Sequence, residues 1–142
     1  MVLQRRTPSA HDRVVAHIAA QASDYIVYTN IGGHHSAYLV QPPLEVCPDI
    51  VLCDSESWMV EHVIEVETEE TVNPASARRW MSAARAVRHQ GKFWLLVPPT
   101  VMRAAMLLCQ QYRIPARIGV WTVDGQKVTV SWAPQFALYR QR

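Results

Sequence analysis

The sequence predicts an α/β fold in which helices flank a mixed central sheet. Apolar residues at helical spacing, as over residues 14–22, alternate along the chain with short apolar runs bounded by turn residues, which are typical of strands. The near-continuous apolar run from Phe93 to Val97 is expected of a strand buried on both faces. A chain of 142 residues is about one domain, so residues 1–142 are predicted to fold as a single unit.

Turn and cap residues bound the predicted elements. Ser9 is a suitable N-cap for the first helix, and Asp12 lies three residues later, as the acid of a capping box does. Asn73 and Pro74 fit the N-cap and the first position of the second helix. Asp124-Gly125 is the strongest two-residue signal for a hairpin. The predicted elements are a helix at 9–22, a strand at 24–30, a short run at 37–40, a hairpin with strands at 50–53 and 60–66, a helix at 74–89, a strand at 93–97, a helix at 98–112, and strands at 117–123 and 127–132.

Composition indicates a cytoplasmic protein without a membrane segment. Nearly half of the residues are apolar and five are Trp, so we expect a packed core, with Trp58 inside it or, alternatively, exposed as a stacking platform. The chain has no run of about eighteen apolar residues, and its first residues lack the apolar core of a signal peptide. Cys47, Cys53 and Cys109 are odd in number and widely spaced, which favours reduced thiols with an apolar packing role over disulfides or zinc.

Charge is distributed unevenly along the chain, although the net charge is only +2. Residues 49–70 contain eight of the twelve acidic residues and no Lys or Arg. The rest of the chain carries fourteen basic residues against four acids, and twelve of the fourteen are Arg, which suits bidentate contacts with phosphate. An acidic centre in a basic surround suits a metal-dependent protein that acts on a polyanion, although many small proteins also have uneven charge.

Asp49, Glu65 and Glu67 are the candidate catalytic residues. Glu65 and Glu67 lie two apart near the end of the second hairpin strand, so both project to one face while Ile64 and Val66 project to the other. Glu is depleted in strands and seldom buried alone, and neighbouring carboxylates repel unless a cation lies between them. Mg²⁺ or Mn²⁺ prefers such oxygen ligands, and Asp49 on the adjacent strand would complete the cluster.

The same residues resemble a known pattern: Pro48-Asp49, fifteen intervening residues, then Glu65-Val66-Glu67. The pattern is similar to that of the PD-(D/E)XK nuclease superfamily, whose restriction-endonuclease-like fold is a mixed central sheet flanked by helices. The resemblance implies that Asp49 and Glu65 bind Mg²⁺, that the carbonyl of Val66 is a further ligand, and that the protein is an endonuclease acting on DNA. Glu67 stands where the family usually has Lys, as it does in some restriction enzymes of the superfamily.

Five further residues are candidates for contact with nucleic acid. His34 and His35 point to opposite faces in an extended chain, and an exposed loop is their alternative explanation. Arg78 and Arg79 lie on the helix that follows the carboxylate strand, where a solvated helix face is the alternative to phosphate contacts. Lys92, at the start of a predicted strand, is also a candidate to replace the missing Lys of the motif.

Two functions remain open from the sequence. The first is Mg²⁺-dependent hydrolysis of a phosphodiester in DNA, in which a nearby Arg or a second metal ion replaces the charge of the motif Lys and a homodimer would cut both strands. The second is an inactive nuclease-like domain that binds DNA or a partner protein. A glycosidase has only the paired carboxylates in its favour. If Asp49 pointed away from the glutamates, or a fixed arginine plugged the cluster, the argument for catalysis would fail.

Overall fold

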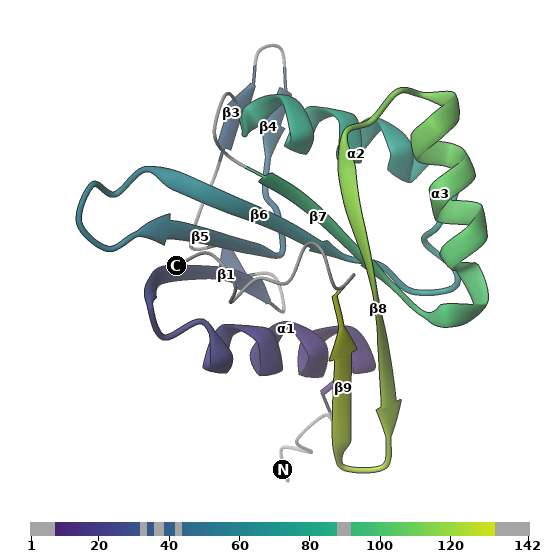
Figure 1. The fold of residues 1–142 in the computed structure, drawn as a ribbon, viewed down its shortest axis with the longest axis horizontal. Coiled ribbons are helices and arrows are strands. Elements are labelled where there is room, and N and C mark those ends of the chain that lie inside the picture. Colours follow the sequence, from purple (N-terminus) through teal and green to yellow (C-terminus); the bar gives the residue numbers. More distant parts are fainter. Residues whose placement is uncertain (1–7, 32–33, 36–38, 42–43, 88–91, 133–142) are drawn as a thin grey trace, which may run out of the picture.

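The computed structural model describes residues 8–31, 34–35, 39–41, 44–87 and 92–132, with the backbone alone between 34 and 46 (Figure 1). Its helices are α1 (Ala10–Gln21), α2 (Pro74–Ala86) and α3 (Met102–Gln111), with a 3₁₀ turn η1 (Pro99–Val101) before α3. Its strands are β1 (Tyr25–Ile31), β2 (His34–His35), β3 (Leu39–Gln41), β4 (Leu44–Val46), β5 (Ile50–Asp54), β6 (Val60–Val66), β7 (Lys92–Val97), β8 (Ala116–Asp124) and β9 (Lys127–Ser131). The fold is therefore mixed α/β, as predicted.

Seven of these strands form a mixed sheet in the order β2-β1-β5-β6-β7-β8-β9. β1, β5 and β6 are antiparallel neighbours, β6, β7 and β8 run parallel, and β9 returns antiparallel to β8. The hairpin predicted over residues 50–66 is confirmed, with Ile50 opposite Ile64. β3 and β4 pair with each other as a separate two-stranded ribbon.

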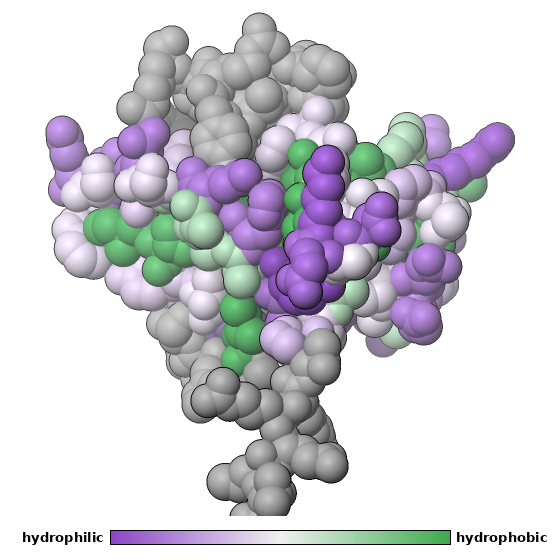
Figure 2. Space-filling view, turned by 90° about the horizontal axis from the view of Figure 1, so that it is seen from below, coloured by the Kyte–Doolittle hydropathy of each residue, from purple (hydrophilic) through white to green (hydrophobic). Residues whose placement is uncertain are grey.

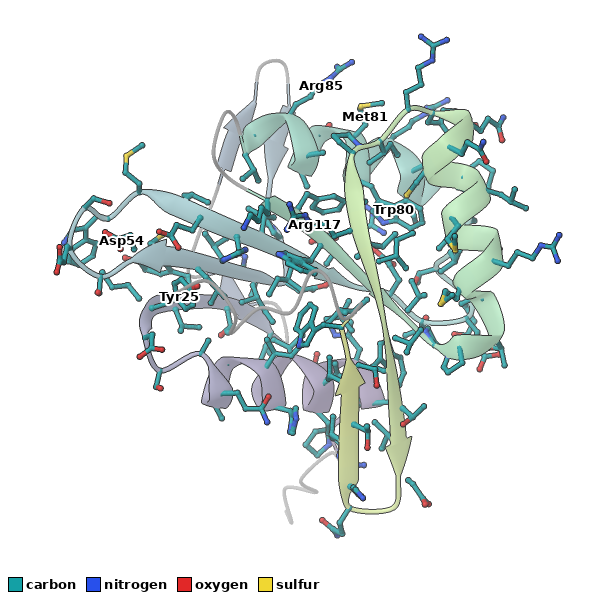
Figure 3. All side chains as sticks on the ribbon, viewed as in Figure 1. Tyr25, Asp54, Trp80, Met81, Arg85 and Arg117 are labelled. Carbon is teal, nitrogen blue, oxygen red and sulfur yellow. The ribbon has the colours of Figure 1, made fainter. Side chains whose placement is uncertain are left out.

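Helices cover both faces of the sheet, with α1 on one side and α2 and α3 on the other (Figure 1). On the α1 side, Ile18 packs in a cluster with Ile64 and Trp94. On the opposite side, Trp80 lies between α2 and the sheet and belongs to the cluster that contains Leu95 (Figure 3). Alternate residues of β6 and β7 therefore enter different clusters, and both faces of these strands are buried, as the apolar run at 93–97 predicts.

The helix starts are capped as predicted. Ser9 Oγ accepts the backbone N–H of Asp12 at 3.1 Å, and Asn73 Oδ1 accepts that of Ser76 at 2.9 Å. Seen from the α1 side, hydrophilic side chains gather near the centre of the surface, with apolar patches beside them (Figure 2). No helix among the described residues is long and apolar enough to cross a membrane.

Three local predictions are wrong. The helix predicted over 74–89 ends at Ala86, while residues 88–89 lie outside the described part of the chain. His34 and His35 form β2, which pairs with the end of β1, instead of a loop. Trp58 is 63% exposed, so of its two predicted positions the buried one is wrong, because the turn between β5 and β6 extends beyond the helices that cover the sheet (Figure 1). Cys53 and Cys109 are buried, which confirms their predicted packing role.

Candidate functional site

Asp49 and Glu65 meet where β5 begins and β6 ends. Because Ile50 pairs with Ile64, the residue before β5 lies beside the end of β6. The backbone N–H of Asp49 donates to Glu65 Oε1 at 3.0 Å, and that of Val66 donates to Asp49 Oδ2 at 2.8 Å. These two hydrogen bonds hold both carboxylates at the carboxyl end of β6, which is where open α/β sheets commonly bind ligands.

Arg79 of α2 lies against both glutamates. Its Nη1 is 3.3 Å from Glu65 Oε2, and its Nη2 is 3.4 Å from Glu67 Oε1. Nη2 also donates to Ser76 Oγ at 2.9 Å. Glu65 and Glu67 are only 4% and 3% exposed, whereas the side chain of Arg79 is 55% exposed. The guanidinium group therefore separates the buried carboxylates from solvent, and its own exposure leaves it room to move.

Glu67 is held by neutral donors as well as by the arginine. Trp80 Nε1 donates to Glu67 Oε1 at 2.9 Å, and Trp121 Nε1 donates to the backbone oxygen of Glu67 at 2.9 Å. The backbone N–H of Glu67 donates to Leu96 O at 2.8 Å, which extends the β6–β7 ladder past the end of β6. Glu67 thus has a fixed position, and its carboxylate is shared between an indole and a guanidinium.

His11, which the sequence analysis did not identify, completes the cluster from α1. Its Nε2 lies 3.0 Å from Asp49 Oδ1, and its Nδ1 lies 2.8 Å from Asp12 Oδ1. The hydrogen bond with Asp49 is the largest of the effects that raise the pKa of His11 to about 9, against the opposing effect of burial. The only signal in the sequence is a His beside an acid in the first turn of a helix, which carries no tertiary information.

The pKa of Glu65 reflects its burial beside two other carboxylates. Burial is the largest effect raising the pKa of Glu65 well above its ordinary value, followed by the charges of Asp49 and Glu67. The charge of Arg79 and the N–H of Asp49 act in the opposite direction but do not cancel this rise. A divalent cation near Glu65 would relieve the repulsion among the three carboxylates.

The donor chemistry suits Mg²⁺ or Mn²⁺, but the side chains are not arranged around an ion. Within the described ranges, no group of three or more His, Cys, Asp or Glu side chains is placed to hold a metal. His11 lies against one oxygen of Asp49, and Arg79 binds one oxygen of each glutamate. Val66, the other predicted ligand, donates its N–H to Asp49. The cluster can therefore hold a divalent cation only after Arg79 leaves the two glutamates.

The candidate nucleic-acid residues are dispersed. Arg78 is exposed on α2 next to Arg79, and the side chains of His34 and His35 lie outside what the structure describes. Lys92 pairs with His62 in the parallel ladder, whereas Glu65 pairs with Leu95. Three residues of strand separate these positions by about 10 Å. Lys92 therefore does not replace the motif Lys, and that prediction is wrong.

No family model, curated protein or solved structure matches this chain. Its fold and site define the class only as a mixed α/β protein with a buried acidic centre beneath an arginine.

Proposed function

We propose that this protein is a Mg²⁺-dependent endonuclease that hydrolyses phosphodiesters in DNA, with the restriction-endonuclease-like fold of the PD-(D/E)XK superfamily. The observation that carries the proposal is the contact between Asp49 and Glu65, through the N–H of Asp49 and Glu65 Oε1 at 3.0 Å. The mixed central sheet with helices on both of its faces also supports it. Both features agree with what the resemblance implies.

Each residue of the cluster has a distinct task in this proposal. Asp49 and Glu65 would hold the ion, with the carbonyl of Val66 as a further ligand, and His11 orients Asp49. A bound ion supplies a water of lowered pKa and polarises the scissile phosphate. Glu67, fixed by Trp80, positions the attacking water. Arg79, once free of the glutamates, supplies the positive charge that the motif Lys provides elsewhere, because a carboxylate cannot stabilise a developing negative charge.

Nicking of supercoiled plasmid DNA tests the proposal. Wild-type protein should nick in Mg²⁺ or Mn²⁺ and not in EDTA, and Glu65→Gln, which keeps the size of the side chain, should lower the rate by about 100-fold or more. Glu69→Gln is the matched control, because Glu69 is exposed just beyond the cluster. This variant should nick DNA at the wild-type rate. Circular dichroism checks that both variants fold. Undiminished nicking by Glu65→Gln would refute the assignment.

The second candidate is an inactive nuclease-like domain that binds DNA or a partner protein. One observation favours it: Arg79 already pairs with both glutamates, at 3.3 and 3.4 Å, without any metal. Isothermal titration with Mn²⁺ separates the two functions. The nuclease should show a Mn²⁺ site that is lost in Asp49→Asn, whereas a pure binding domain should bind no Mn²⁺ and should shift DNA or a partner equally well in EDTA.

A further inference from the structure

The turn between β5 and β6 presents two large apolar side chains to solvent. Trp58 is 63% exposed and Met59 is 68% exposed. Asp54 Oδ2 accepts the N–H of Glu56 at 3.2 Å and that of Ser57 at 2.7 Å, and Asp54 O accepts the N–H of Trp58 at 2.9 Å. Trp58 has a φ of 64°, a left-handed conformation that bulky residues rarely adopt. We call residues 55–59 the hairpin tip: a hydrogen-bonded turn that displays apolar side chains.

Acidic residues surround the hairpin tip. Glu56 lies within it and Asp54 precedes it. Asp24 is nearby, because Tyr25 pairs with Asp54 and both lie at the same end of the sheet (Figure 3). No Lys or Arg occurs between residues 49 and 70. This surface would repel a phosphate backbone, so it suits an apolar protein surface with a basic rim instead of nucleic acid.

α3 carries a surface of that kind. Met102, Met106 and Leu107 are 39%, 49% and 56% exposed. Met102 and Met106 lie four residues apart and so neighbour each other on the helix surface, and Leu107 follows Met106 in the chain. Arg103 lies among them and Arg113 follows the helix, both exposed. α3 contains no acidic residue. We call these five residues the α3 face, which combines an apolar centre with positive charge.

We propose that the hairpin tip of one copy of this chain docks on the α3 face of a second copy. The two surfaces match in both respects, since each has an apolar centre and their charges are opposite. They lie at opposite ends of the longest axis of the molecule, so they cannot meet within one chain but do meet when copies line up head to tail (Figure 1). Such a contact is heterologous and leaves a free tip and a free α3 face on the terminal copies.

The small size of the two surfaces sets the strength of association. A turn of five residues on one face of a ten-residue helix buries less than the roughly 1,200 Å² typical of stable complexes. Association is therefore weak and increases with protein concentration. The proposal does not depend on nuclease activity, because neither surface contains a residue of the acidic cluster.

Sedimentation velocity in EDTA, from about 10 µM to about 1 mM protein, tests the proposal. The mean mass of the wild type should rise with concentration. Trp58→Ser and Met106→Ser should each remain monomeric, and folding is preserved because both side chains are exposed. A wild type that remains monomeric at every concentration overturns the proposal. So does association that survives both substitutions.

A charge exchange identifies the two surfaces as partners. Glu56→Arg and Arg103→Glu should each associate at least about tenfold more weakly than the wild type, which corresponds to about 1.4 kcal/mol. An equal mixture of the two variants should associate about as strongly as the wild type, because the basic tip of one variant meets the acidic α3 face of the other. Glu69→Arg, an exposed charge change elsewhere, is the matched control and should associate normally. Failure of the mixture to recover contradicts the pairing.

Discussion

Arg79 is the residue on which the chemistry of the acidic site depends. It lies 3.3 Å from Glu65 and 3.4 Å from Glu67, so it occupies the side of the cluster that a cation would approach. Its side chain is 55% exposed, whereas the two carboxylates that it contacts are almost fully buried. The guanidinium offsets only one of the two negative charges when no ion is bound, so a divalent ion, which carries twice its charge, would compete with it for the same carboxylates.

Replacing Arg79 should separate metal binding from cleavage. Arg79→Ala removes the competing cation, so Mn²⁺ should bind more tightly in calorimetry. The same variant should nick DNA more slowly, because the positive charge that replaces the motif Lys is lost. Arg78→Ala, at the exposed neighbouring position, is the control and should leave Mn²⁺ affinity unchanged. Equal affinities in the wild type and Arg79→Ala would show that Arg79 does not compete with the metal.

His62 is a buried histidine away from the acidic cluster. Its Nδ1 accepts the Nε1–H of Trp94 at 2.9 Å, and its Nε2 lies 3.4 Å from Tyr25 Oη. Burial is the largest effect lowering the pKa of His62 to about 4, followed by the charges of Lys92 and Arg117. The ring is therefore neutral in the folded protein at pH values where the unfolded chain already binds a proton.

This pKa shift predicts a loss of stability in acid. As pH falls from 6.5 to about 4, the unfolded chain gains a proton at His62 and the folded protein does not, so the free energy of unfolding falls. The full effect is on the order of 3 kcal/mol. Urea unfolding at several pH values should show that the stability of wild type relative to His62→Gln declines over this window. A difference that is constant with pH would contradict the shift.

At the scale of elements, periodic patterns predicted most helices and strands correctly. The stripe over residues 14–22 packs α1 onto the sheet, and the apolar run at 93–97 is buried on both faces. Caps at Ser9 and Asn73 are visible in sequence because they act within one turn of chain. The register between parallel strands is not local, which explains the error at Lys92: nothing in the sequence places it beside His62 instead of Glu65.

Gly119 in β8 is required by close packing. A Cβ at this position would lie 2.7 Å from Leu96 Cδ2 and 2.9 Å from the backbone oxygen of Ser131. The backbone of β9 is held by its pairing with β8 and cannot shift without disturbing the sheet. Gly119→Ala should therefore lower the free energy of unfolding by about 1–3 kcal/mol. Gly125→Ala is a useful comparison, because space there is open and only the φ of 57° opposes Ala. Urea unfolding that leaves Gly119→Ala as stable as the wild type would contradict the packing.

At the scale of the whole molecule, the site divides into a part that sequence predicts and a part that tertiary structure supplies. Asp49 and Glu65 belong to one hairpin, so local pairing brings them together. His11 and Arg79 come from α1 and α2, and their positions depend on how these helices dock on the sheet. The sequence could not decide between a buried and an exposed Trp58, because composition does not reveal how far the helices cover the sheet.

The central claim is that the acidic cluster binds a divalent metal after Arg79 moves. Anomalous difference density from crystals grown with saturating Mn²⁺ tests it most directly. We predict a peak bounded by the carboxylates of Asp49 and Glu65, with the guanidinium of Arg79 withdrawn from Glu65 and Glu67. Absence of such a peak, with Arg79 still paired to both glutamates, would contradict the account.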